Sequence, residues 1–366
     1  MRRLAVVLGV LAVTMGVAPG VQAARPFSAT SVWNTPIGPA PVLDSLSALR
    51  IVDLTTLMNT STQAGKPPAL NYKSWSTTVY YVNSSAPKLP LVITGTGTKN
   101  QRLQQLIDAH GGVPFPAGAE PSDENDAQIT VVNTDTGTLY EFFEASTPAQ
   151  NADGRWHAST GGIIFDHRLD PGYFSRNSWP GLGLNEGWNW GANATSLPML
   201  GGLITLEDLQ TGVVNHALHA ATPATCKNEI WFPAQRNDAG ASQAHASCMP
   251  EGARLQLDPS VNVETDPAFA HPLVKMIGRA AQQYGIIVND TTGGNFAFES
   301  QDPGNGTPDP YTSGPGVGGV PNGDRGYLQG KQYYNVLDSF PWAKLRVLKA
   351  PRSCPANPET GPCPPP

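Results

Sequence analysis

Residues 128–144 read QITVVNTDTGTLYEFFE, two short runs of β-branched and aromatic residues around a polar turn. Runs of this composition predict strands, and the Asp and Gly of the intervening TDTG are residues that a tight turn needs. We therefore expect an antiparallel hairpin of Gln128–Asn133 with Thr138–Glu144. Ile286–Asp290 and Asn295–Glu299, joined through a Thr-Thr-Gly-Gly turn, predict a second hairpin of the same kind.

Strand patterns outnumber helical patterns in the rest of the chain. The further strands expected from β-branched or aromatic runs are Thr78–Val82, Leu91–Thr94, Glu229–Pro233 and Ala253–Leu257. The helices expected from apolar spacing and capping residues are Leu46–Met58, Lys99–His110, the segment that Asp266 opens, and a short helix at Thr205–Asp208. The predicted fold is mainly β, with a β-sandwich or jelly-roll core and a few helices on loops.

The composition indicates strands and ordered loops, and it argues against some classes of partner. Only 14% of the residues are charged, against roughly 25% in typical soluble domains, and the chain has 38 Gly and 35 Pro. The net charge is −6 with no basic cluster, so we expect no nucleic-acid partner and no membrane partner. We expect the protein to be a monomer.

The N-terminus has the three parts of a signal peptide. Arg2 and Arg3 precede the apolar run Leu4–Val17, and Val21–Ala23 supplies small residues where a signal peptidase cleaves. The alternative is a membrane-spanning helix, but the run is short for a bilayer core of roughly 30 Å. We expect residues 1–23 to be removed and the mature protein to be secreted into the extracellular space.

The four cysteines form two local pairs in the sequence. An even number in an exported chain predicts disulfides, and although four cysteines allow three pairings, short loops lose the least entropy on closure. The pairings expected are Cys226 with Cys248 and Cys354 with Cys363. The last pair staples a Pro-rich tail, residues 350–366, to a single β-rich domain that spans residues 24–349.

The segment 155–190 is the most informative about function. It holds four of the chain's eight tryptophans among Gly, Asn and Ser, where a core would have Leu, Ile and Val. Flat rings beside amide and hydroxyl groups suit sugars, whose C–H faces stack on aromatic rings while their hydroxyls need polar partners. The alternative is that the rings only pack loops. The residues expected to bind a glycan are Trp156, Trp188, Asn189, Trp190 and Asn193.

Two reactions on glycans fit the titratable residues of the chain. Glycoside hydrolysis uses two carboxyl groups at a fixed separation, but no spacing in the sequence selects a pair. A polysaccharide lyase would instead neutralise a uronate with Arg and use His or Tyr as base and acid. Each residue also has a structural alternative; Asp166 and His167, for example, point to opposite faces of a regular strand. The candidate catalytic residues are Glu141, His157, Asp166, His216, Arg254 and Tyr284.

His216 and His219 raise the question of a metal site, because residues three apart share a helix face and two histidines there could bind a metal. Their surroundings instead predict a strand, on which the two rings diverge, and the sequence offers no further ligand. Motifs for serine esterases, zinc proteases and phosphate-binding loops are absent. We expect no metal and no other cofactor.

The chain carries several short motifs, among them SVWNTP at residues 31–36, NHAL at 215–218, PEGAR at 250–254 and FPW at 340–342. Together they resemble a largely uncharacterised family of exported actinobacterial proteins. The resemblance covers most of the mature chain and implies an exported protein with one contiguous domain. Asn215 departs from the family pattern, which has an acidic residue before this His, and the resemblance supplies no active site.

These observations predict a secreted carbohydrate-active enzyme, either a glycoside hydrolase or a polysaccharide lyase, whose partner is an extracellular or cell-wall polysaccharide. The alternatives are a non-catalytic glycan-binding or cell-surface protein and, third, a metal-dependent enzyme that uses His216 and His219. An enzyme should bring a His and a carboxylate into a Trp-lined cleft, whereas a binding protein should show the aromatic rings on a flat face.

Overall fold

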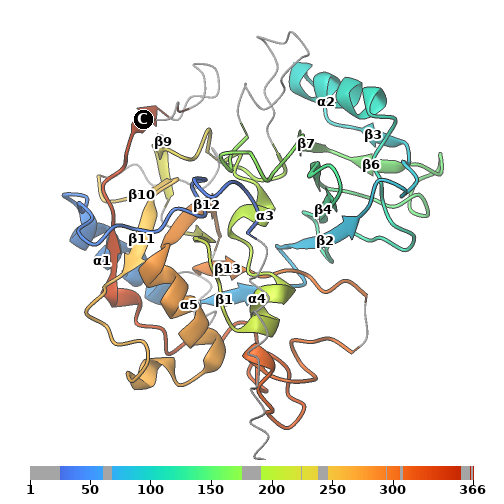
Figure 1. Ribbon diagram of the computed structural model, residues 1–366. Helices are drawn as coiled ribbons and strands as arrows, with labels where there is room; N and C mark the ends of the chain where they lie inside the picture. Colours follow the sequence, from blue (N-terminus) through green and yellow to red (C-terminus); the bar gives the residue numbers. More distant parts are fainter. Residues whose placement is uncertain are drawn as a thin grey trace, which may run out of the picture.

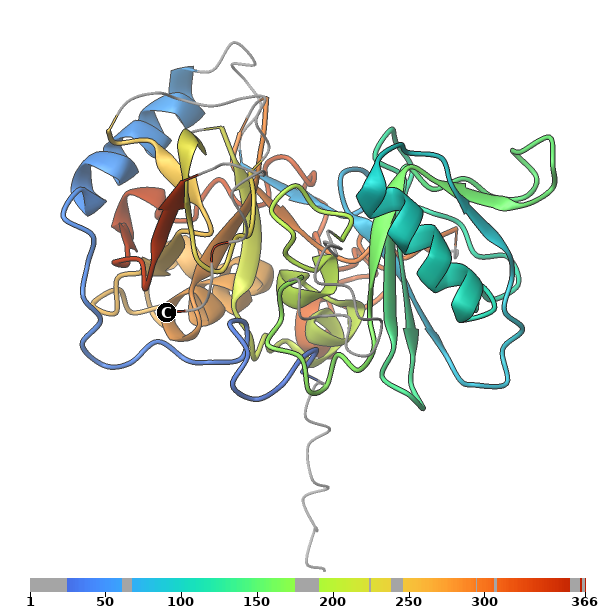
Figure 2. The same cartoon turned by 90° about the horizontal axis from the view of Figure 1, so that it is seen from above.

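The structure is a computed structural model that describes residues 25–60, 68–174, 191–223, 225–237, 246–293, 295–305 and 308–355, with Cys363 and Pro366. The expected signal peptide lies outside the described residues, as do the candidate glycan-binding residues Trp188, Asn189 and Trp190. The described strands and helices form two lobes, which Figure 2 shows side by side.

The smaller lobe is built from consecutive elements of the first half of the chain. Its elements are β2 (Thr77–Val82), β3 (Leu91–Ile93), α2 (Thr98–Ala109), β4 (Gln128–Asn133), β5 (Leu139–Phe143), β6 (Trp156–Ala158) and β7 (Thr160–Ile164). One sheet has the strand order β2-β4-β5-β7, and β3 pairs with β6 in a second. Leu103, Leu106 and Ile107 of α2 share a buried cluster with Ile129 and Val131 of β4, so this helix closes the core of the lobe.

The hairpin expected at residues 128–144 is present as β4 and β5. The two strands pair antiparallel, with Ile129 opposite Phe142 and Val132 opposite Leu139. Gly137 has a φ of 74° in the turn, a conformation that residues with a side chain rarely adopt. The composition of a few adjacent residues was therefore enough to predict this part of the smaller lobe.

The larger lobe combines helices and strands that precede the smaller lobe in sequence with those that follow it (Figure 1). Its helical elements are α1 (Ser47–Thr60), α3 (Met199–Gly202), α4 (Leu206–Thr211), η2 (Pro267–Phe269), α5 (Pro272–Gln283), η3 (Val317–Gly319) and η4 (Trp342–Lys344). Its strands are β1 (Ala69–Asn71), β8 (Leu218–Thr222), β9 (Thr225–Trp231), β10 (Met249–Glu251), β11 (Arg254–Leu257), β12 (Ile286–Thr291), β13 (Ala297–Glu299), β14 (Leu345–Val347) and β15 (Ser353–Pro355). The main sheet has the order β1-β13-β8-β12-β11-β14, and β10-β9-β15 form a smaller one.

The second predicted hairpin, of Ile286–Asp290 with Asn295–Glu299, is wrong. Both strands form, but β8 lies between them, parallel to β12 and antiparallel to β13. All five residues of β8 are buried, and a strand without exposed positions favours the middle of a sheet. The local turn therefore joins two strands that are not neighbours, a relation that no pattern within the turn itself reveals.

The fold class is mixed α/β. Strands account for 24% and helices for 19% of the structure, so the predicted strands and helices are both present, but in a mixed fold and not in a mainly β one. A jelly roll consists of antiparallel strands, whereas β2 with β4, β3 with β6 and β8 with β12 pair in parallel here. The described strands form open sheets in place of the expected sandwich or jelly roll.

A buried cluster joins the two lobes. It contains Val132 of β4 and Ile164 of β7 from the smaller lobe together with Ile287 of β12 from the larger one. Trp33 belongs to the same cluster, is fully buried, and donates its indole N–H to the Gly172 carbonyl at 2.7 Å. The segment after the expected cleavage site is thus part of the packing between the lobes.

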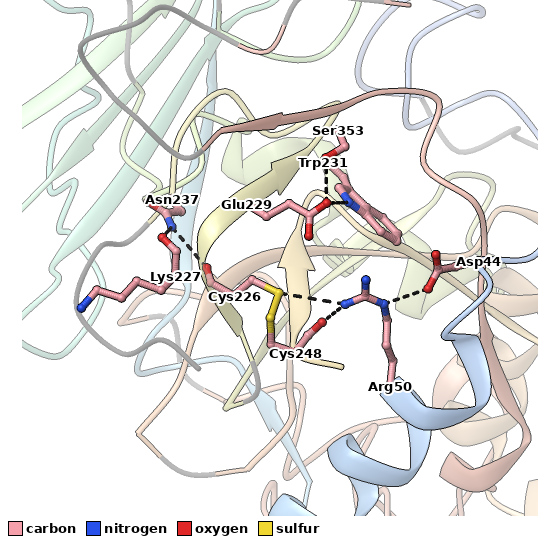
Figure 3. Close-up of a disulfide and its surroundings, with 9 residues drawn as sticks. All are labelled: Asp44, Arg50, Cys226, Lys227, Glu229, Trp231, Asn237, Cys248 and Ser353. Carbon is pink, nitrogen blue, oxygen red and sulfur yellow. Dashed lines mark hydrogen bonds and ion pairs between the residues drawn. A yellow bond between two sulfur atoms is a disulfide. The ribbon is translucent and has the colours of Figure 1, made fainter. Parts of the chain in front are cut away.

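Both predicted disulfides are present, Cys226–Cys248 and Cys354–Cys363. Figure 3 shows the first with Arg50 of α1, which donates to the Cys248 carbonyl and has its guanidinium 5.0 Å from the centre of the Trp231 ring. Cys354 of the second disulfide lies in β15, which pairs antiparallel with β9, so the start of the predicted tail belongs to a sheet. No helix in the described part of the chain is long and apolar enough to cross a membrane.

Candidate functional site

The predicted catalytic residues are spread over both lobes. His157 on β6 and Arg254 on β11 come from strands that lie on opposite sides of the molecule in Figure 1. The His157 Nε2 atom lies 3.1 Å from both carboxylate oxygens of Asp153. Asp166 forms an ion pair with Arg168, with 2.7 Å between Oδ1 and Nε. These partners are close neighbours in sequence, so each pair is a local contact and does not bring the predicted catalytic residues together.

Glu141 is fully buried on β5 and faces the chain segment that leads into α3. Its Oε1 atom accepts the Ala192 N–H at 2.8 Å, and its Oε2 atom accepts the Met199 N–H at 3.0 Å. Burial raises the pKa of Glu141 to about 7, although the two backbone hydrogen bonds act in the opposite direction. The carboxyl group therefore connects the lobes rather than lining an open site.

His216 is buried beside α4 and has a partner at each ring nitrogen. Its Nε2 atom lies 3.4 Å from Asp208 Oδ2, and its Nδ1 atom lies 2.9 Å from the Ala217 carbonyl oxygen. Burial lowers the pKa of His216, but the hydrogen bond and charge of Asp208 outweigh it, so the pKa is raised. Asp208 also completes the capping box with Thr205, which confirms the predicted capped helix.

His219 lies on β8 between two polar residues of the neighbouring strands. Its Nε2 atom is 3.2 Å from Glu299 Oε2, and its Nδ1 atom is 3.2 Å from Asn289 Nδ2. His216 and His219 therefore have different carboxylate partners. Among the described residues, no three His, Cys, Asp or Glu side chains come together in a way that could hold a metal ion.

The remaining candidates make structural contacts. Arg254 donates to the Tyr284 carbonyl and, at 2.7 Å, to the Thr35 carbonyl, which ties β11 to the N-terminal segment. Trp156 is buried and stacks on Phe115 with 4.0 Å between ring centres. Asn193 is also buried, and its side-chain oxygen accepts the Thr195 N–H at 2.9 Å.

A pocket of about 140 Å³ opens where loops of the two lobes meet. Two backbone hydrogen bonds hold the lobes together there, from the Asp123 N–H to the Lys73 carbonyl at 3.1 Å and from the Asp302 N–H to the Thr77 carbonyl at 3.0 Å. The lining residues come from three segments of the chain and are Lys73, Glu120, Pro121, Asp123, Asp302, Gly304, Asn305 and Asp309. Four of these eight residues are acidic and one is basic, so the pocket is a negatively charged site.

Asp302 is the deepest of these acids, with 6% of its surface exposed. Burial is the main reason that its pKa rises to about 7, and the charges of Asp123 and Asp309 raise it further. The Gly304 N–H, which donates to Oδ1 at 2.8 Å, and the Lys73 ammonium act in the opposite direction. The Asp302 carboxyl therefore keeps its proton to a much higher pH than an ordinary aspartate does.

Asp309 has a different environment in the same pocket. Its Oδ2 atom lies 3.1 Å from Lys73 Nζ and accepts the Tyr72 hydroxyl at 3.5 Å, and its Oδ1 atom accepts the Tyr311 N–H at 2.9 Å. Burial and the Asp309 charge raise the pKa of Tyr72 to about 12, so the phenol keeps its proton and remains a donor. One carboxyl that holds a proton near pH 7 thus lies near another that is paired with a cation, an arrangement suited to general acid–base chemistry.

Sequence reasoning missed Lys73, Asp302 and Asp309. Asp302 opens a Gly/Pro-rich stretch of the sequence, where an Asp beside Pro and Gly indicates a turn. The available signal was the recurrence of Asp at 302 and 309 on either side of that turn. It becomes informative only when the loop is known to fold back onto β2 of the other lobe, where Asp302 bridges to Thr78.

Comparison with known proteins gives no match, because no protein-family model, no curated protein and no solved structure aligns with the chain. The choice of this pocket as the candidate functional site therefore depends on its geometry and its chemistry.

Proposed function

We propose that this protein is a secreted glycoside hydrolase that acts on an extracellular polysaccharide, with Asp302 as the general acid. The observation that carries the proposal is the buried Asp302 carboxyl, with its pKa raised to about 7, in an open pocket that also contains Asp309. Two carboxyl groups in different protonation states are what hydrolysis of a glycosidic bond requires.

The roles of Asp302 and Asp309 in the reaction follow from their different environments in the pocket. Asp302 protonates the glycosidic oxygen as the bond to the leaving sugar breaks, because it still holds a proton near neutral pH. Asp309 is the carboxylate that stabilises positive charge on the sugar ring or activates the attacking water, and Lys73 and the Tyr72 hydroxyl fix its orientation.

The charge of the pocket favours hydrolysis over the lyase reaction. A lyase acts on a uronate and needs cationic or amide groups to neutralise the carboxylate that the substrate carries. Glu120, Asp123, Asp302 and Asp309 outnumber Lys73 here, so an anionic sugar would be repelled. The expected substrate is therefore an uncharged glycan.

The size of the pocket is informative about how the substrate binds. A volume of about 140 Å³ is below the roughly 300–1,000 Å³ of pockets that enclose a whole drug-sized ligand. Part of one sugar unit fits inside, and the rest of the glycan lies across the surface. The two disulfides agree with a protein that works in an oxidising, extracellular setting.

The test is incubation of the purified mature protein with a panel of neutral and uronate-containing polysaccharides, with new reducing ends and unsaturated products both measured. We expect new reducing ends from a neutral glycan without unsaturated products, and kcat/KM should fall above pH 7 as Asp302 loses its proton. Asp302→Asn should lose a factor of about 10²–10⁴ in kcat, the usual contribution of a general acid.

Asp123→Asn is the comparison variant, because Asp123 lines the same pocket and acts on the proposed reaction only through the charge that helps to raise the pKa of Asp302. It should retain most of the activity. Unsaturated products would contradict the hydrolase in favour of a lyase. Binding of a glycan without any cleavage would instead favour a non-catalytic glycan-binding protein.

A further inference from the structure

A row of tyrosines leads from the pocket to an exposed surface of the larger lobe. Tyr72 follows β1, and its hydroxyl reaches Asp309 in the pocket. Its ring stacks on Tyr311 with 3.9 Å between centres and meets the edge of Tyr333 at 6.5 Å. Tyr333 in turn meets Tyr334 at 5.1 Å. The rings thus form a continuous row of contacts from the pocket to Tyr334.

The outer end of this row is open to solvent. Tyr333 is 38% exposed and Tyr334 is 41% exposed, whereas Tyr311 at the inner end is fully buried. The Leu70 N–H donates to the Tyr333 carbonyl at 2.8 Å, so the tyrosine segment is attached to the strand that precedes the pocket. The exposed rings are therefore connected to the site by this backbone hydrogen bond as well as by the contacts between the rings.

The surroundings of the exposed rings suit a sugar rather than an apolar partner. Lys331 and Gln332, which directly precede Tyr333, are exposed as well and offer hydrogen-bond donors beside the rings. Sugars combine C–H faces that stack on aromatic rings with hydroxyl groups that need such donors. The acidic pocket at the inner end leaves an uncharged chain as the ligand that both parts accept.

We propose that Tyr333 and Tyr334 form a binding subsite for the polysaccharide chain outside the pocket, so that the protein acts on polymers in preference to short oligosaccharides. This inference rests on the proposed function in one respect, which is that the same glycan occupies the pocket and the tyrosine row. It identifies the substrate class as an uncharged polymer with several sugar units in contact with the protein.

The test measures binding separately from cleavage. Inactive Asp302→Asn protein is run in native gels that contain soluble β-glucan, galactomannan or dextran, with polygalacturonate as the anionic probe, and the dissociation constant is taken from the retardation. Tyr333→Ala and Tyr334→Ala, each in the Asp302→Asn background, should weaken binding to the retained neutral polymer about 2- to 12-fold. That range is the conversion of about 0.5–1.5 kcal/mol for one aromatic stacking contact, at 1.4 kcal/mol per tenfold.

Three controls accompany the measurement. Tyr333→Phe should bind like the parent protein, because a phenyl ring still stacks. Tyr81→Ala removes another exposed tyrosine, on β2 of the smaller lobe, and should leave binding unchanged. Thermal unfolding of each variant shows whether it is folded.

The outcomes separate this inference from the proposed function. Weaker binding by both alanine variants supports the subsite, even if the wild-type protein cleaves no polymer and the hydrolase proposal fails. Unchanged binding by both variants overturns the subsite, even if the wild-type protein is an active hydrolase. Absence of retardation by every neutral polymer also overturns it.

Discussion

Glu141 should make the stability of this protein depend on pH in an unusual direction. Most carboxyl groups with partners have a lowered pKa in the folded state and stabilise the fold as pH rises. Glu141 is fully buried, and its pKa is raised from 4.5 to about 7. In the folded state it therefore binds a proton more tightly than in the unfolded chain.

The sign and size of the pH dependence of stability follow from this difference in the pKa of Glu141. A raised folded-state pKa gives stabilisation that is fully present below about pH 4.5 and is lost as pH rises through about 7. Each unit of difference between the folded and unfolded states corresponds to about 1.4 kcal/mol, so the free energy of unfolding should lose about 3 kcal/mol over this window.

Glu141→Gln isolates this contribution, because glutamine does not ionise. The amide keeps one acceptor but turns an N–H₂ group toward the Ala192 or Met199 backbone N–H, which should cost about 1–3 kcal/mol at every pH. The variant should therefore be less stable than the wild type in acid, and the gap should narrow by about 3 kcal/mol as pH rises through 7.

The assay is urea unfolding of both proteins at several pH values between about 4.5 and 8, with their difference in unfolding free energy plotted against pH. Subtraction at each pH removes the titration of other groups, such as Asp302. Glu144→Gln, a change at an exposed glutamate nearby, should show a constant small difference. A gap between wild type and Glu141→Gln that stays constant, or that widens with rising pH, would refute the reasoning.

Two further predictions concern packing and cross-linking. Gly202→Ala places a Cβ atom 2.6 Å from the Cβ atom of His219. The variant should therefore melt at a lower temperature, with a loss in the free energy of unfolding of about 1–3 kcal/mol. In the control Gly38→Ala the added methyl group meets nothing within 4 Å, so the melting temperature should change little. Serine at both Cys226 and Cys248, which are 22 residues apart, should lower the free energy of unfolding by about 3 kcal/mol in chemical denaturation; no loss would mean that the reduced chain is already constrained.

Local patterns in the sequence predicted local structure well. The β4–β5 hairpin was predictable because both strands and the turn lie within residues 128–144. Helix α2 was predictable from Leu103, Leu106 and Ile107, whose spacing places them on one face. The order β13-β8-β12 was not predictable in this way, because β8 is inserted from a distant part of the chain.

The candidate site was less accessible to sequence reasoning. The pocket combines Lys73, Asp123 and Asp302 from three separate segments, and its electrostatics arise from burial that a sequence does not display. Trp156 shows the converse limit, since a ring predicted from its segment to bind a glycan stacks on Phe115 inside a core. Neighbours in sequence are a poor guide to what a ring contacts when the partner comes from another segment.

The two lobes differ in how much of the chain must be present before they can assemble. The elements of the smaller lobe are contiguous from Thr77 to Ile164, so its sheets can assemble as soon as that stretch has been made. The larger lobe includes α1 near the beginning of the chain and β14 near its end, and Asp44 donates its N–H to the Val347 carbonyl at 3.0 Å. A chain that ends before Leu345 would therefore hold a complete smaller lobe beside a main sheet whose β11 edge is still unpaired.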